Sequence, residues 1–289
     1  MSQRNPPALL ASWYLLTLLL ACAVSASGAS REDCERQFKP HTGQQGKDVV
    51  WVPTNDSLVA RMLQMAQVSA TDWVYDLGAG DGKIAIAAAR DFGAEAVGVE
   101  YDPQLAKLAQ CYVEADGVGK RVRIVQGDIF ETDFSSATVV TLYLLPELNL
   151  RLRPTILNMK PGTRVVSHSF LMDDWEPDER SMTEDGSAYL WIVPAKVAGK
   201  WSFRPADGNK GQFVAELQQK FQQLEGRADG KPLISDARVR GSQLDLTFIE
   251  NGAPTKVSGR VEGDRIDAQV TRGGKTSRYI GTRAQAGSG

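Results

Sequence analysis

Three glycines at alternate positions mark the stretch of the chain with the clearest chemical potential. Gly78, Gly80 and Gly82 follow a short apolar run and precede an alanine-rich run with helical spacing, so the backbone must turn tightly between a strand and a helix. Glycine adopts positive φ at little cost and lets a ligand touch bare backbone. The third glycine comes two residues after the second, one fewer than in the dinucleotide-binding fingerprint, and the carboxylate of Asp76 stands just before the loop. This pattern favours a nucleoside ligand with a positive charge over one with a pyrophosphate.

Two further acidic residues close apolar runs later in the chain. Glu100 ends a run about twenty residues after the glycine loop, and Asp128, followed by Ile129, ends the next. The carboxyl ends of parallel strands meet at one edge of a sheet, and ligands of such sheets bind there. We therefore expect these side chains to lie beside Asp76.

This order of motifs resembles that of class I S-adenosylmethionine-dependent methyltransferases. In that family the glycine loop cradles the methionyl part of the cofactor, the first acidic residue holds the ribose hydroxyls and the second lies against the adenine. The resemblance implies S-adenosylmethionine as the cofactor and no metal site. The residues implied in cofactor binding are Asp76, Gly78, Gly80, Gly82, Glu100, Asp128 and Ile129, together with Thr54 on a lead-in segment like that of some protein-lysine methyltransferases.

The stretch from Val139 to Phe170 resembles two groups of lysine methyltransferases, the telomeric-silencing histone enzymes and the mitochondrial enzymes that modify a rotor subunit of ATP synthase. The likeness covers roughly residues 49–185 and implies methyl transfer to a protein lysine. Tyr143 would orient the amine by its ring face, and Glu147 would accept from it. Both also suit structural roles, as a buried strand-end tyrosine and a helix-cap glutamate.

Methyl transfer from a sulfonium uses a reagent that is already activated. The protein must mainly align the acceptor with the methyl group, so proximity contributes most to the rate. No dedicated acid–base pair is expected, and two histidines are too few for a hydrolytic site with a metal. Two alternatives stay open: a small-molecule methyltransferase, and an exported non-catalytic module retained for cofactor binding or scaffolding. With a net charge of -2 there is no basic field, so no nucleic-acid partner is expected.

The N-terminus carries an apolar run from Ala8 to Val24, preceded by Arg4 and followed by small residues. It reads as a secretory signal within residues 1–29, which predicts an exported protein, periplasmic or secreted. An uncleaved membrane anchor, or a lipoprotein signal ending at Cys22, are the alternatives, and membrane contact is expected only through this segment. The other two cysteines, Cys34 and Cys111, do not indicate a disulfide framework or a metal site.

Residues 30–48 are predicted to form a polar tail, and residues 49–196 an α/β domain. There, strands alternate with helices, which predicts a doubly wound, mostly parallel Rossmann-like sheet. The expected strands cover residues 73–77, 96–100, 121–126, 137–143 and 163–168, and the expected helices begin near Asn55, Lys83 and Asp102.

Residues 197–285 are predicted to form a smaller antiparallel all-β domain. Its alternating segments are separated by Gly-Ser, Asn-Gly, Gly-Asp and Gly-Gly pairs, which are hairpin signals. The expected strands cover residues 234–240, 243–250, 254–262, 265–271 and 276–282, with 213–224 favoured as a further strand. The side chains expected inside are Leu244, Leu246, Phe248, Val257, Val261, Ile266 and Val270.

Overall fold

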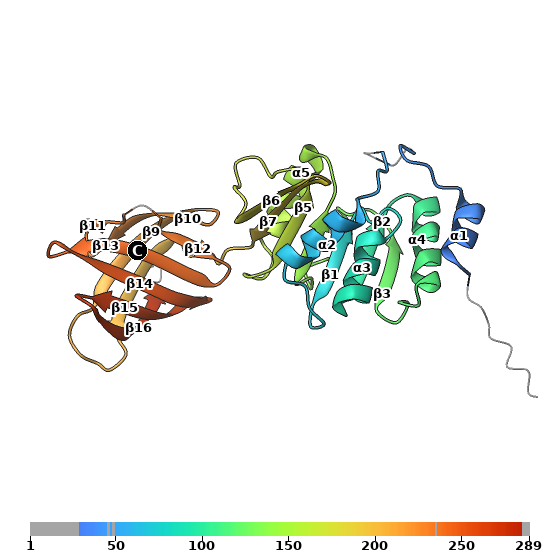
Figure 1. Ribbon diagram of the computed structural model, residues 1–289. Coiled ribbons are helices and arrows are strands. Elements are labelled where there is room, and N and C mark those ends of the chain that lie inside the picture. The colour runs from blue at the N-terminus through green and yellow to red at the C-terminus, as the bar shows by residue number, and fades with distance from the viewer. Residues whose placement is uncertain (1–28, 45–46, 48–49, 235, 285–289) are drawn as a thin grey trace, which may run out of the picture.

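The computed structural model describes residues 29–44, 47, 50–234 and 236–284, and shows an α/β part followed by a β-barrel (Figure 1). The predicted signal segment lies outside these residues, except for Ala29. Within the described ranges, none of the helices combines the length and the apolar character needed to cross a bilayer.

The α/β part is built on a seven-stranded mixed sheet. Its strands are β1 (Trp73–Leu77), β2 (Glu95–Glu100), β3 (Val122–Gln126), β4 (Val139–Leu142), β5 (Arg164–His168), β6 (Glu179–Thr183) and β7 (Gly186–Ile192). They lie in the order β3-β2-β1-β4-β5-β7-β6. The first five pair in parallel, whereas β7 pairs antiparallel with β5 and β6. The predicted doubly wound, mostly parallel sheet is confirmed, and the β6–β7 hairpin is an addition that the sequence did not reveal.

Helices cover both faces of this sheet. The helices are α2 (Asp56–Met65), α3 (Lys83–Phe92), α4 (Pro103–Ala115) and α5 (Pro146–Ile156). The first three share a core with one face of the sheet, and α5 packs on the other face. Asp102 is the N-cap residue of α4, and its Oδ1 accepts from the backbone N–H of Gln104 at 2.9 Å and of Leu105 at 2.8 Å. This cap fixes the helix that follows Glu100.

The expected polar tail at residues 30–48 is wrong for its first part. Arg31–Phe38 form helix α1, which begins with a capping box between Ser30 and Asp33 and packs on α4. Its one buried side chain, Cys34, is joined to Cys111 of α4 by a disulfide with a Cα–Cα distance of 5.9 Å. The interpretation that these two cysteines make no disulfide framework is corrected by this bond. Helix α1 was hidden because its sequence is almost entirely polar.

The second sheet closes into a barrel. Its strands are β8 (Gly199–Pro205), β9 (Phe213–Lys220), β10 (Gln223–Ala228), β11 (Lys231–Pro232), β12 (Arg238–Arg240), β13 (Gln243–Glu250), β14 (Ala253–Glu262), β15 (Arg265–Arg272) and β16 (Lys275–Arg283). All pair antiparallel, and an additional pairing of β9 with β10 closes the ring, with β11 outside it. All seven side chains predicted to lie inside are buried. The antiparallel domain is therefore confirmed.

Two strand predictions in the barrel need correction. The single strand expected over residues 213–224 is split into β9 and β10, because the chain reverses at Phe221, which has a φ of 52°. The strand expected over residues 234–240 shrinks to β12, three residues long.

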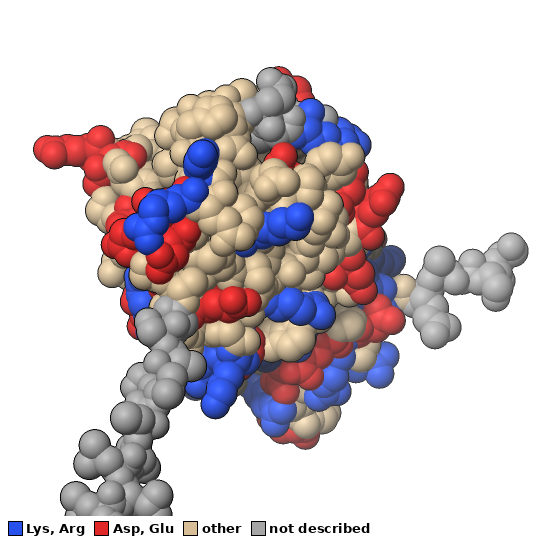
Figure 2. All heavy atoms as spheres, turned by 90° about the vertical axis from the view of Figure 1, so that its right-hand side faces the viewer, with Lys and Arg blue, Asp and Glu red and all other residues tan. Residues whose placement is uncertain are grey.

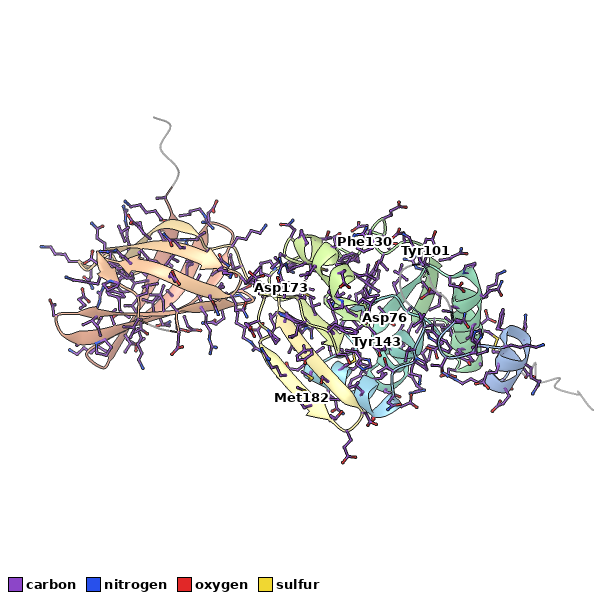
Figure 3. All side chains as sticks on the ribbon, turned by 90° about the horizontal axis from the view of Figure 1, so that it is seen from above. Asp76, Tyr101, Phe130, Tyr143, Asp173 and Met182 are labelled. Atoms are coloured by element: carbon purple, nitrogen blue, oxygen red, sulfur yellow. A yellow bond between two sulfur atoms is a disulfide. The ribbon has the colours of Figure 1, made fainter. Side chains whose placement is uncertain are left out.

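The loop after β5 fastens the α/β part to the barrel. The ring of Trp175 stacks on Phe221 with the ring centroids 5.8 Å apart. The side-chain amide of Gln222 donates to the backbone carbonyl of Glu176 at 2.6 Å. Figure 3 shows Asp173, from the same loop, on the side of the α/β part that faces the barrel.

Candidate cofactor and acceptor site

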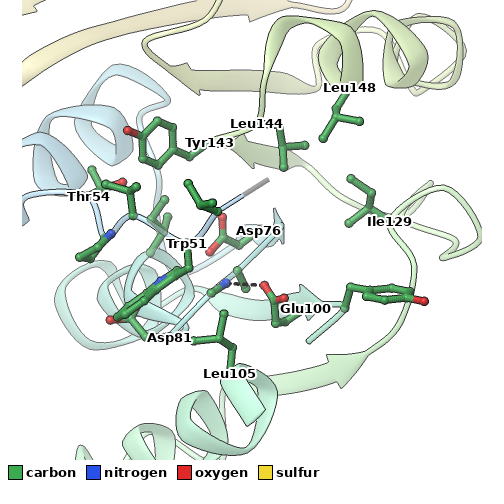
Figure 4. Close-up of a pocket in the computed structure, with 18 of the residues that line it drawn as sticks. Trp51, Thr54, Asp76, Asp81, Glu100, Leu105, Ile129, Tyr143, Leu144 and Leu148 are labelled. Carbon is green, nitrogen blue, oxygen red and sulfur yellow. Dashed lines mark hydrogen bonds between the residues drawn. The ribbon is translucent and has the colours of Figure 1, made fainter. Parts of the chain in front are cut away.

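A cavity of about 330 Å³ opens at the carboxyl edge of the parallel strands (Figure 4). It is large enough for a small-molecule ligand and is lined mainly by apolar side chains. Of the residues singled out from the sequence, Thr54, Asp76, Gly78, Gly80, Glu100, Asp128, Ile129 and Tyr143 line it, whereas Gly82 and Glu147 do not.

Asp76, at the end of β1, is only 2% exposed. Its Oδ1 accepts from the hydroxyl of Thr141 at 2.7 Å, but its Oδ2 makes no hydrogen bond of normal geometry within the described residues. Burial raises the pKa of Asp76 to about 7, against the opposing effect of the Thr141 hydrogen bond. A buried carboxylate oxygen without a donor is costly, so the site is suited to a ligand that brings a donor or a positive charge.

Glu100 fixes the glycine loop. Its Oε2 accepts from the N–H of Gly80 at 2.8 Å (Figure 4). Its Oε1 accepts from the N–H of Asp102 at 2.8 Å. Burial raises the pKa of Glu100, and these backbone donors oppose the shift. Each carboxylate oxygen can accept a second hydrogen bond, so ribose hydroxyls remain suitable partners. Glu100 thus positions the loop in addition to the ligand role inferred from its sequence position.

The loop itself depends on glycine at two points. Gly78 and Gly80 have φ values of 83° and 56°. A methyl group added at Gly80 would lie 2.6 Å from Nε1 of Trp51, and one added at Gly78 would lie 2.8 Å from Cδ2 of Leu144. Gly82 instead precedes α3, where a methyl group would press on Ala109 of α4 at 3.1 Å, so it serves helix packing.

The cavity beside β3 is shaped by a cation that the sequence did not reveal. Lys47 lies with its Nζ 2.5 Å from Oδ2 of Asp128 and 4.8 Å from the ring centroid of Tyr101. The N–H of Phe130 donates to the other oxygen, Oδ1, at 2.9 Å. The Lys47 ammonium is the main cause that holds the pKa of Asp128 below its ordinary value. Lys47 is 81 positions from its partner, so no local pattern indicated the pair.

The opposite end of the cavity is aromatic. The ring of Tyr143 stacks on the ring of His168, with the two centroids 3.7 Å apart. The ring of Phe170 also stacks with Tyr143, at a centroid distance of 6.3 Å. The hydroxyl of Thr54 lies 3.1 Å from Nδ1 of His168. Burial lowers the pKa of His168, so its ring is neutral at neutral pH. Glu147, predicted as an acceptor from the amine, is exposed in the first turn of α5.

Part of the cavity lining is aliphatic and exposed. Val50, Val52 and Leu145 line the cavity, yet each has 40 to 50% of its surface exposed. Exposed aliphatic side chains grouped at a cavity mouth indicate contact with another molecule. A ligand that contacts these side chains therefore loses contact with water.

The fold and the cavity together define the class of protein, a class I S-adenosylmethionine-dependent methyltransferase. The residues fit the cofactor on two counts: Asp76 offers a buried acceptor without a donor, and the bare backbone at Gly78 permits close approach. The model of the ANTKMT methyltransferase domain family matches residues 76–179, which span the cavity-forming strand ends but not the barrel.

Comparison with known proteins shows to which family within this class the chain belongs. The chain is 47% identical over 151 residues to the protein-lysine N-methyltransferase of Saccharolobus islandicus, a match that covers 50% of this chain and 94% of that enzyme. It is 31% identical to a lysine N-methyltransferase of Xenopus laevis that is named for a subunit of ATP synthase, over 44% of this chain and 56% of that enzyme. The chain belongs to the protein-lysine N-methyltransferase family that the archaeal enzyme represents.

One solved structure has similar identity but a different named substrate. It is an RNA methyltransferase from Salinibacter ruber in complex with S-adenosyl-L-homocysteine, 47% identical, with a TM-score of 0.50. The match covers 55% of this chain and 100% of that one. Its ligand supports S-adenosylmethionine as the cofactor here.

Proposed function

We propose that this enzyme transfers a methyl group from S-adenosylmethionine to the side-chain amine of a lysine in a protein. The observation that carries the proposal is the aromatic end of the cavity, where Tyr143 stacks on the neutral ring of His168. An aromatic ring face attracts an ammonium group and can orient it. The names of the archaeal and frog relatives support the same acceptor.

The residues divide the work between two ends of the cavity. S-adenosylmethionine, when bound, supplies an activated methyl group. Asp76, Glu100 and Asp128 would hold its polar groups at the strand ends, while Tyr143 would align the acceptor amine beyond Leu144. The exposed aliphatic part of the cavity lining excludes water, which favours the neutral, nucleophilic form of the amine. The protein thus contributes mainly alignment, which is worth up to about 7 to 11 kcal/mol.

The test is to incubate the purified protein with S-adenosylmethionine labelled in the methyl group and an extract of its own cells. We expect label in precipitated protein and methyllysine after acid hydrolysis. Replacing Tyr143 by Ala should remove most of the labelling, whereas Tyr143→Phe keeps the ring and should retain it. Label confined to small solutes would contradict the proposal.

RNA is the second candidate acceptor, because of the name of the Salinibacter ruber structure. Charge argues against it, since residues 1–198 contain 18 Lys and Arg against 25 Asp and Glu, a net charge of -7. On the face in Figure 2 acidic and basic side chains are interspersed rather than gathered into a basic surface. Digesting the labelled extract with ribonuclease or with protease separates the two candidates. The reported relatives do not favour the small-molecule or non-catalytic alternatives.

We also propose that the chain is exported by its N-terminal segment. The Cys34–Cys111 disulfide supports export, because structural disulfides persist mainly in oxidising compartments. A fusion of the first thirty residues to a reporter that is active only outside the cytosol tests the proposal. A silent reporter would refute it.

A further inference from the structure

One wall of the cavity comes from the segment that precedes the α/β fold. Trp51 is partly buried, and its indole packs so closely on the glycine loop that a methyl group at Gly80 would lie 2.6 Å from its Nε1. Figure 4 shows this ring beside Asp81 and the loop. A side chain that touches the loop on the cavity side must also border whatever the loop binds.

The backbone of Trp51 is held by residues that follow helix α1. The N–H of Gly43 donates to the carbonyl of Trp51 at 2.8 Å, and the N–H of Trp51 donates to the carbonyl of Gln44 at 2.9 Å. We call α1 with the residues up to Gln44, together with residues 50–54, the N-terminal clasp. The position of Trp51 therefore depends on where α1 is anchored.

Helix α1 is anchored on the C-terminal half of α4 by one covalent bond and by partly buried polar contacts. The covalent bond is the Cys34–Cys111 disulfide. Arg31 donates from Nε and Nη2 to the carboxylate of Asp116 at 2.7 and 2.8 Å, and its guanidinium lies 4.5 Å from the ring centroid of Tyr112. An eight-residue helix is too short to be stable alone, and its ion pair with Asp116, although bidentate and partly buried, is not covalent. The disulfide is therefore the strongest anchor.

We propose that Trp51 forms a wall of the cofactor site and that the Cys34–Cys111 disulfide holds it there, so that reduction of this disulfide weakens cofactor binding. Reduction by dithiothreitol transfers two electrons and two protons to the bridge, leaves a thiol on each cysteine and oxidises the reagent to its cyclic disulfide. Helix α1 then loses its covalent anchor on α4. The two backbone hydrogen bonds that hold Trp51 lose their support with it.

Thermodynamic reciprocity gives the coupling a second readout. If the disulfide strengthens cofactor binding by some factor, bound cofactor makes the disulfide harder to reduce by the same factor. A tenfold coupling corresponds to about 30 mV in the midpoint of this two-electron couple. The shift is measured without turnover and without any acceptor, so it does not depend on the lysine assignment.

The test measures the Kd for S-adenosylhomocysteine by titration calorimetry, in a Cys22→Ser background that leaves Cys34 and Cys111 as the remaining cysteines. We expect binding about tenfold weaker in the reduced protein, a typical size for coupling between sites. The Cys34→Ser, Cys111→Ser double variant should bind as weakly without reductant. Trp51→Ala should also bind weakly and should no longer respond to dithiothreitol, since both changes remove the same wall.

Two outcomes would overturn the proposal. Equal affinity of the oxidised and reduced proteins would show that the disulfide does not support the site. An undiminished response to dithiothreitol in Trp51→Ala would show that the disulfide acts through another part of the molecule. Circular dichroism is recorded in parallel, because loss of the native spectrum on reduction would mean that the bridge supports the whole domain, which also contradicts a local role for the clasp.

Discussion

The two parts of this molecule differ in the charged groups that they bury. The barrel is filled by large apolar side chains such as Trp201, Phe203 and Phe248, all fully buried. The α/β part instead keeps carboxylates inside, and among the described residues every buried Asp or Glu belongs to it. Burying an unpaired charge costs far more than burying a ring. The difference teaches that the barrel is built for stability, whereas the strand ends of the α/β part are kept ready for a ligand.

The largest expected effect is on the stability of the barrel. Phe203 stacks on Phe213 with centroids 4.7 Å apart and is fully buried, so Phe203→Ala should cost about 3 to 5 kcal/mol in the free energy of unfolding of the barrel. Val214→Ala, on the exposed side of β9, is the matched control and should cost little. Denaturant unfolding measures both, and the Kd for S-adenosylhomocysteine should stay unchanged. A loss of cofactor affinity in Phe203→Ala would contradict the view that the barrel and the cofactor site act independently.

The next effect is on the pH dependence of stability without ligand. Because the folded protein raises the pKa of Asp76 to about 7, the folded state holds this proton more tightly than the unfolded state does. The stability from this group is complete below about pH 4 and is lost as the pH rises to 7, by about 4 kcal/mol in all. Asp76→Asn should therefore gain stability over the wild type as the pH rises. Urea unfolding of both proteins at several pH values checks this, and the same pH dependence in both would contradict it.

Cofactor affinity should respond to Glu100. Glu100→Ala removes the acceptor for the N–H groups of Gly80 and Asp102 and for the ligand hydroxyls, at about 1.5 to 3 kcal/mol for each charge-assisted bond. The Kd for S-adenosylhomocysteine should rise by more than tenfold. Glu250→Ala, which breaks an ion pair with Arg272 in the barrel, should leave the Kd unchanged. Equal affinities for Glu100→Ala and the wild type would remove the cofactor role assigned to Glu100.

The smallest effect compares one substitution in both parts. Thr54→Val removes the contact with His168 at 3.1 Å, and Thr255→Val removes a hydrogen bond to Glu250 at 3.0 Å in the barrel. Each should cost about 0.5 to 1.5 kcal/mol of stability. Only Thr54→Val should shift the proton resonances of His168, which are easy to assign because the chain has two histidines. Unchanged resonances would mean that Thr54 does not hold the ring.

Local patterns in the sequence predicted both sheets well. Alternation in the barrel located the buried side chains, and Asn251-Gly252 marked a hairpin where both residues adopt positive φ. The position of the cavity could also be predicted from local patterns, because the carboxyl ends of parallel strands lie together at one edge of a sheet. Contacts between residues far apart in the sequence could not be predicted. Cys34 and Cys111 are 77 positions apart, and neither stands in a pattern that specifies its partner. Trp51 lines the cavity, and no local pattern in the sequence indicated that position.

The attachment of the barrel to the loop after β5 has a consequence for chain entropy. Phe170, at the aromatic end of the cavity, begins a loop whose later residues Trp175 and Glu176 are fastened to Phe221 and Gln222. A loop fixed at both ends samples far fewer conformations than one fixed at a single end. Strands β5 and β6 already fix the two ends of this loop, and the contacts with the barrel add a further fixed point in its middle. Ending the chain before β8 would remove the barrel and these contacts. The loop after β5 would then sample more conformations, while the cofactor side of the cavity would stay unchanged.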